Sequence, residues 1–110
     1  MKKAPQFRLV LVTAPNRKVA RQLAASALRS RLVACANLIA GVESHYWWKN
    51  KLESATEVLI IFKTVHTHLA PLEELVIESH PYDTPEFVVV PLTGGNPRYL
   101  QWLGESVGKK

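Results

Sequence analysis

The stretch from Val33 to Thr64 constrains the fold of this chain more than any other part of the sequence. Two extended, largely apolar arms of about fifteen residues flank the polar tip Lys49-Asn50-Lys51, and asparagine tolerates the left-handed backbone that a tight hairpin needs. Ordinary strands have about five or six residues. We therefore expect a β-hairpin whose arms are far longer than ordinary strands.

The second arm of this hairpin changes character along its length. Residues 52–57 alternate in polarity, whereas residues 58–62 are apolar at every position. A segment that is apolar on both sides is expected to be covered on both faces of its sheet. The aromatic segment Tyr46-Trp47-Trp48 lies too far along the ribbon to reach the same core. We interpret the outer half of the hairpin as a surface that packs on another subunit, although tryptophans could also stack on nucleic-acid bases.

The remaining patterns predict a single domain over residues 1–110 with the order β-α-β-β-α-β-α. Asn16 and the pair Asn96-Pro97 are expected to begin helices, because asparagine caps helix N-termini and proline fits the first helical position. The expected elements are a strand at 7–13, a helix at 17–31, the two hairpin strands, a helix at 66–80, a strand at 86–90 and a short helix at 97–107. The fold class is therefore α+β, a ferredoxin-like βαββαβ arrangement with a long β-hairpin and a C-terminal helix.

The ferredoxin-like arrangement would leave one face of the sheet bare, because both crossover helices lie on the other face. In this chain the bare face would carry large apolar side chains, such as Leu9 with Leu11 or Val10 with Val12. Leaving about six such side chains in water forgoes roughly 9–18 kcal/mol. That amount is comparable to the whole stability of a domain, about 5–15 kcal/mol. We therefore expect the chain to self-associate through its sheet.

Composition narrows the class of protein. Cys35 is the sole cysteine, so no internal disulfide can form, and a reducing compartment is the default interpretation. No signal-length or membrane-length apolar stretch occurs, which predicts a soluble, cytoplasmic chain without a membrane partner. The net charge of +5 is spread along the sequence and includes Lys109 and Lys110. It favours a solvated surface, with an anion-binding face as the alternative.

Two places could carry chemistry. Cys35 lies between alanines, where a thiol is most often a small core residue and less often a ligand or a reactive group. The segment His80-Pro81-Tyr82-Asp83-Thr84-Pro85-Glu86 brings an imidazole, a phenol and two carboxylates into a loop stiffened by prolines. This segment is either a plain connector or a rigid polar pocket for a small anion or a metal ion, with Lys63 as a possible neighbour.

Two further functions are compatible with the predicted topology. An acylphosphatase-like small enzyme would need an arginine-bearing loop that cradles an anion after the first strand, and Thr13-Ala14-Pro15-Asn16 does not supply one. A basic nucleic-acid-binding module would use the positive charge, but the central strands carry aliphatic rather than base-stacking residues, so nucleic acid is an unlikely partner. The sequence pairs no nucleophile with a base, and we assign no catalytic residue.

Taken together, the motifs resemble the CutA family of divalent-cation tolerance proteins over nearly the whole chain. The matching segments are Thr13-Ala14-Pro15, residues 32–37, Tyr46-x-Trp48-Lys49, Glu57-Val58-Leu59 with Lys63-Thr64, His80-Pro81-Tyr82-x-x-Pro85-Glu86 and residues 95–103. The resemblance implies a non-catalytic homotrimer, a role in tolerance to divalent metals, copper above all, and a ligand-binding cleft between subunits. The expected cleft residues are Trp48, Lys63, His80, Tyr82 and Glu86.

Two departures from this family concern copper. Some bacterial members carry a cysteine where this chain has Val12 and a second histidine where it has Ser79. The resemblance therefore implies at most weak Cu(II) binding led by an imidazole. The candidate metal ligands are His80, Cys35 and Glu86.

Overall fold

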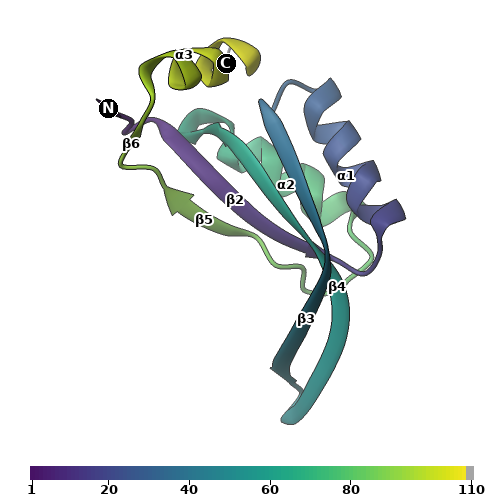
Figure 1. The fold of residues 1–110 in the computed structure, drawn as a ribbon. Helices are drawn as coiled ribbons and strands as arrows, with labels where there is room; N and C mark the ends of the chain where they lie inside the picture. The colour runs from purple at the N-terminus through teal and green to yellow at the C-terminus, as the bar shows by residue number, and fades with distance from the viewer. Residues whose placement is uncertain (109–110) are drawn as a thin grey trace.

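The computed structural model describes residues 1–108, so Lys109 and Lys110 of the predicted domain lie outside the described residues. A four-stranded antiparallel sheet has the order β3-β4-β2-β5 (Figure 1). Its strands are β2 (Phe7–Ala14), β3 (Cys35–Trp48), β4 (Lys51–Val65) and β5 (Val88–Pro91). The helix α1 (Arg17–Arg29) connects β2 to β3, and α2 (Leu69–Ser79) leads from β4 toward β5. The predicted α+β class is confirmed.

One face of this sheet is covered by α1 and α2. Alternate side chains of β2 and β4 point into this core, because successive residues of a strand face opposite sides. They pack against small and aliphatic residues of both helices, and the buried set is Val10, Val12, Ala14, Val58, Ile60 and Phe62 from the strands with Ala20, Leu23, Ala27, Leu72 and Val76 from the helices. The predicted burial of the apolar run at residues 58–62 is confirmed on this side for Val58, Ile60 and Phe62.

The opposite side of the sheet is named the open face. The strand register places the residues of the open face side by side on neighbouring strands. These residues are Leu9, Leu11 and Thr13 of β2, Leu59, Ile61 and Lys63 of β4, and Val88 and Val90 of β5. All of them are partly exposed, and Val88 reaches 49% exposure. The helix α3 (Pro97–Ser106) covers only the end of this face, where Leu100 and Leu103 pack on Phe7. Large apolar side chains therefore remain uncovered within the chain, as the sequence predicts.

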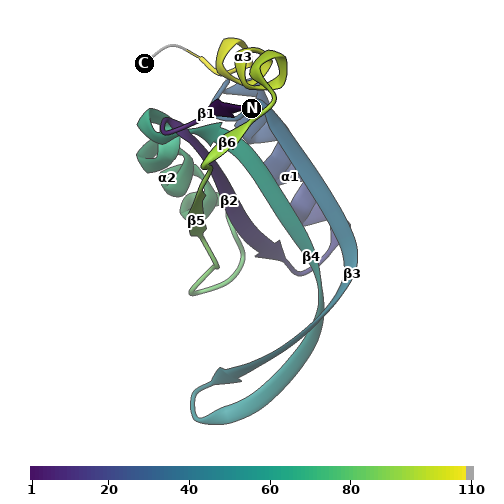
Figure 2. The same cartoon turned by 60° about the vertical axis from the view of Figure 1, so that its left-hand side comes forward.

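The hairpin formed by β3 and β4 extends well beyond the rest of the sheet and curves away from it (Figures 1 and 2). Its turn consists of Lys49 and Asn50, both with positive φ (50° and 64°), and confirms the predicted tip. Such a two-residue turn matches the twist of the flanking strands. The ladder between the two strands is irregular between Ile39 and Val42, where Gly41 has a φ of 75°. This bulge lies where the ribbon leaves the sheet.

Several element ends differ from the prediction. The helix α1 ends at Arg29 rather than at residue 31, because Arg31 adopts a left-handed conformation (φ 58°). The amide of Arg31 then donates to the carbonyl of Leu28, and the amide of Leu32 donates to the carbonyl of Ala27. This pair of hydrogen bonds satisfies carbonyls at the helix end. The predicted asparagine cap at the start of α1 is confirmed by the bond from the Val19 amide to Asn16.

Differences also occur in the second half of the chain. The predicted helix 66–80 begins as a single 3₁₀ turn, η1 (His66–His68), before α2. The strand β5 begins at Val88 instead of residue 86, since Phe87 packs against the core. Between β5 and α3 the chain forms a short strand, β6 (Gly94–Gly95), which pairs with β1 (Lys2–Lys3), and neither strand is among the predicted elements. None of the described helices has both the length and the apolar character required to cross a membrane.

Candidate functional site

His80 ties the loop after α2 to the end of β2. It is only 7% exposed, and its Nε2 lies 2.7 Å from the carbonyl oxygen of Thr13. The backbone N–H of Tyr82 donates to its Nδ1 at 3.1 Å. Because a carbonyl only accepts and an amide only donates, a neutral ring with its proton on Nε2 satisfies both contacts. Both ring nitrogens are therefore engaged within the chain.

Tyr82 continues this network toward the hairpin. Its ring packs against His80 with a centroid separation of 4.6 Å, and its hydroxyl donates to Glu57 at 2.7 Å. Glu57 is 7% exposed and lies on β4 just before the apolar run. Burial of the phenol, followed by its hydrogen bond to Glu57 and the charge of that carboxylate, raises the pKa of Tyr82 far above its ordinary value. The phenol consequently stays protonated and remains a donor to the buried carboxylate.

A cavity of about 690 Å³ lies between the hairpin and the loop at residues 82–86. The residues that line it are Thr13, Ser44, His45, Tyr46, Trp48, Glu57, Tyr82, Asp83, Thr84, Pro85 and Glu86. Burial raises the pKa of Glu86, and the negative charge of Glu57 raises it further. The cavity therefore contains mutually repelling carboxylates, an arrangement that favours a positively charged occupant over an anion.

The structure brings together only part of the predicted cleft. Trp48, Tyr82 and Glu86 line the cavity, and His80 lies directly behind Tyr82. Lys63 does not join them within one chain, because it pairs with Leu9 and its Nζ donates to the hydroxyl of Tyr99 at 3.2 Å. The expected cleft lies between subunits, so the membership of Lys63 in it stays a prediction.

The predicted metal ligands are likewise not assembled. Cys35 is opposite Lys63 on the β-ladder, whereas Thr13, which contacts His80, is opposite Leu59. Four residues along a strand span about 13 Å. Among residues 1–108, no three histidine, cysteine or acidic side chains lie together as a metal site. Since His80 has no free ring nitrogen, the set His80, Cys35 and Glu86 does not fit a copper ion in one protomer.

Sequence reasoning missed Glu57 as a member of the site. A signal was present, because Glu57 shares the strand face of Leu59 and Ile61, which is the face expected to be buried. A charge at such a position requires a partner. The partner, Tyr82, lies 25 positions away in the sequence, and only the folded loop brings it to Glu57.

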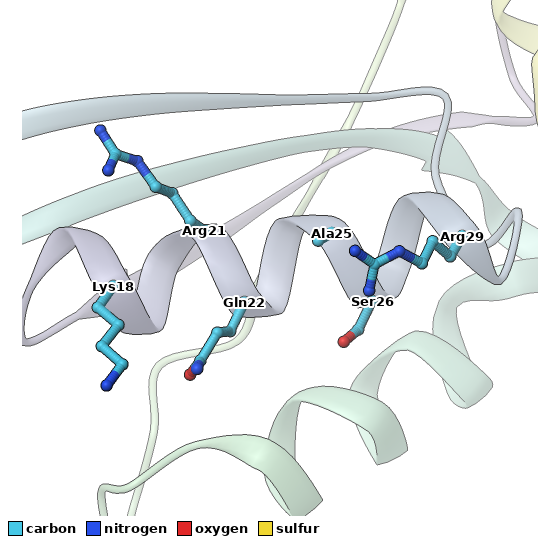
Figure 3. A pocket seen from close by; sticks show the side chains of 6 residues that line it. All are labelled: Lys18, Arg21, Gln22, Ala25, Ser26 and Arg29. Atoms are coloured by element: carbon cyan, nitrogen blue, oxygen red, sulfur yellow. The ribbon is translucent and has the colours of Figure 1, made fainter.

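The outer face of α1 carries one group of basic side chains. A shallow hollow there is lined by Lys18, Arg21 and Arg29 together with uncharged residues (Figure 3). Figure 3 shows Lys18 and Arg21 extending to opposite sides of the helix. The cations therefore do not converge on one point, as a phosphate site requires. Asn16, at the start of the helix, is occupied as its cap, which leaves no anion-cradling loop of the acylphosphatase kind.

Comparisons with known proteins agree on one family. The family model described as CutA1 divalent ion tolerance protein matches residues 8–106. Divalent-cation tolerance protein CutA of Escherichia coli (strain K12 / DH10B) is 46% identical over 99 residues, which are 90% of this chain and 88% of that protein.

Two plant proteins are also similar. Protein CutA, chloroplastic, of Arabidopsis thaliana is 45% identical over 98 residues, or 89% of this chain. The match covers 54% of the Arabidopsis protein, so the chain spans about half the length of that relative. The crystal structure of CutA1 from Oryza sativa superposes with a TM-score of 0.92 at 40% identity and covers 96% of both chains.

Proposed function

The chain belongs to the CutA1 divalent ion tolerance protein family, and from this premise we propose that it acts in tolerance to divalent cations as a non-catalytic, ferredoxin-like homotrimer. Three copies associate through their open faces. The cavity beside the hairpin then lies in a cleft between neighbouring subunits. This assembly would retain the site predicted from the sequence while taking some of its residues from a second chain.

The observation that carries this proposal is the open face itself. Leu9, Leu11, Leu59 and Ile61 are partly exposed in the centre of the sheet, and Val88 flanks them at 49% exposure. Monomeric proteins rarely expose contiguous apolar patches of this kind. The hairpin adds exposed aromatic surface, since Trp47 is 70% exposed, Trp48 41% and Tyr46 42%. Both surfaces need a partner, and a second and third copy of the chain provide one.

Copper has a limited place in this proposal. Binding at His80 would break the ring's bonds to Thr13 and to the Tyr82 amide. We therefore expect Cu(II) binding to be weak and assign the cleft no resident metal. The cavity's carboxylates, Glu57 and Glu86, suit a positively charged ligand better than the small anion that was the alternative expectation.

The compartment also belongs to the proposal. The single cysteine favours the cytoplasm. The Arabidopsis relative, however, is named chloroplastic, so the family is not confined to the cytoplasm. Fractionation of the source cells, with the endogenous chain detected by antibody, tests this assignment. Recovery outside the cytoplasm would refute it.

Sedimentation equilibrium at micromolar concentration tests the assembly. The expected mass is about three times the chain mass of 12.3 kDa. A well-folded monomer under these conditions would refute the proposed burial of the open face. Assays with acyl phosphates test the non-catalytic part, and turnover that disappears when Arg17 is replaced would favour the acylphosphatase alternative instead.

A further inference from the structure

The open face carries two opposite charges at its two ends. Along β4 from Glu57 to Val65, and on the paired parts of β2 and β5, its described charged side chains are Glu57 and Lys63. The residues between them on this face, Leu59 and Ile61, are apolar. Six residues along a strand span about 20 Å. Glu57 and Lys63 of one chain are therefore too far apart to form an ion pair.

Within residues 1–108, neither charge has an oppositely charged partner. The one ion pair found among residues 1–108 joins Glu43 to His45 on the exposed hairpin. Lys63 contacts only a neutral partner, because its Nζ donates to the Tyr99 hydroxyl and lies 5.5 Å from the centre of that ring. Glu57 accepts from another neutral group, the hydroxyl of Tyr82. Covering the open face with apolar surface alone would bury both charges without compensation, which is strongly unfavourable.

We propose that Lys63 of one protomer enters the cavity of the next protomer and lies between Glu57 and Glu86. The inference rests on the proposed trimer and names the contact that sets its geometry. In a ring of three subunits, one patch of each subunit meets a different patch of its neighbour, and the ring closes after three contacts. A cation at one end of the open face and carboxylates at the other end supply these two complementary patches.

Three observations support Lys63 as the group that enters the cavity. It lies within the apolar surface that must be covered, whereas Lys18 and Arg21 are on α1, on the other side of the sheet. The cavity has carboxylates on two of its walls, from β4 and from the loop after α2. The charge of Glu57 disfavours ionisation of Glu86, and an ammonium group placed between them relieves that repulsion.

Charge reversal tests the contact without removing the side chains. Lys63→Glu should raise the protein concentration at which half of the trimer dissociates, by roughly a hundredfold, since three contacts are lost in each trimer. The double variant Lys63→Glu with Glu86→Lys should recover most of that loss. Glu86 is chosen for the reversal because it is less buried than Glu57 and tolerates a change better. Lys18→Glu, which makes the same charge change on α1, is the matched control and should assemble like the wild type.

A second measurement does not depend on how variants fold. A carbodiimide couples an ammonium and a carboxylate that touch, so treatment of the wild-type trimer should give an amide between Lys63 and Glu57 or Glu86, identified by mass spectrometry. The separation of about 20 Å between Lys63 and Glu57 within one chain means that an amide between these two residues joins two chains. Its absence, while other lysine–carboxylate pairs are coupled, would overturn the proposal.

The outcomes separate this inference from the proposed function. If the wild-type chain sediments as a monomer, both the proposed trimer and the proposed contact are refuted. A trimer that tolerates Lys63→Glu without loss, or a double variant no tighter than Lys63→Glu alone, overturns the contact and leaves the trimer standing. Binding of a free amine such as methylammonium in the cavity of the intact trimer would show that Lys63 does not fill it.

Discussion

Replacement of His80 by alanine distinguishes a structural histidine from a copper ligand. The variant loses the hydrogen bonds to the Thr13 carbonyl and from the Tyr82 amide, and the packing of the two rings at 4.6 Å. Each hydrogen bond contributes about 1 kcal/mol. A tilted ring pair contributes about 1 kcal/mol more. The free energy of unfolding should therefore fall by roughly 3 kcal/mol.

Urea denaturation at matched protomer concentration measures this loss, because the stability of an oligomer depends on concentration. With a slope of about 1–3 kcal/mol per molar urea, the midpoint should fall by about 1–3 M. His66→Ala is the control, since His66 is exposed and its hydrogen bonds, from its amide to the Gln6 carbonyl and from the Leu69 amide to its carbonyl, are made by backbone atoms that alanine retains. That variant should stay within about 0.5 kcal/mol of the wild type.

Calorimetric titration with Cu(II) completes the test. Wild type and His80→Ala should both bind copper weakly at most, because the ring nitrogens are already engaged. The reasoning is refuted if His80→Ala keeps wild-type stability while a clear copper-binding signal of the wild type disappears. In that case the imidazole is a ligand, as the sequence alone suggested.

Three further changes test other parts of the structure. Ile61→Asp should dissociate or unfold the trimer in sedimentation velocity, because it buries a charge in the open face at a cost of several kcal/mol, whereas Ile77→Asp at a 53% exposed position of α2, on the other side of the sheet, should not. Arg31→Gly should change the unfolding free energy in urea little, because the relief of a left-handed φ of 58°, about 1 kcal/mol, is offset by loss of the side-chain bond to the Ser106 carbonyl, whereas Arg21→Gly inside α1 should lower it by about 1 kcal/mol. Acidification should weaken the trimer. On assembly, the neighbouring ammonium group lowers the raised pKa of Glu86. The resulting gain in trimer stability is present above the pKa that Glu86 has in the separate protomer, and it is lost as the pH falls through the pKa that Glu86 has in the trimer. Sedimentation across a pH series measures this loss.

A structural feature could be predicted when the residues that determine it lie close together in the sequence. Helix caps depend on contacts three residues away, and Asn16 and Asn96 cap α1 and α3 as expected. The hairpin turn depends on two residues, and Lys49 and Asn50 adopt the conformation that the sequence predicted for the tip. Residues 58–62 and most of β2 are apolar on both sides of the strand, which is why an apolar open face was predictable from the sequence.

The places where the sequence misled are those decided by distant contacts. The start of β5 depends on Phe87 packing against the core, and β6 exists because Lys2 and Lys3 pair with two glycines more than 90 positions away. Nothing within a few residues of these segments signals either outcome. The local sequence fits a strand that begins at residue 86 as well as one that begins at Val88.

The candidate site shows the same division. The sequence alone determined that Trp48, His80, Tyr82 and Glu86 belong near one another, through the resemblance and the stiff loop, and the structure places all four at or behind one cavity. Only the tertiary structure decided how they are used. The register of β4 places Lys63 at the far end of the sheet and Glu57 next to the Tyr82 hydroxyl. The buried ring of His80 is hydrogen-bonded to the Thr13 carbonyl and therefore links the loop to β2. Residue type fixes which chemistry is available, whereas register and burial fix which atoms remain free to perform it.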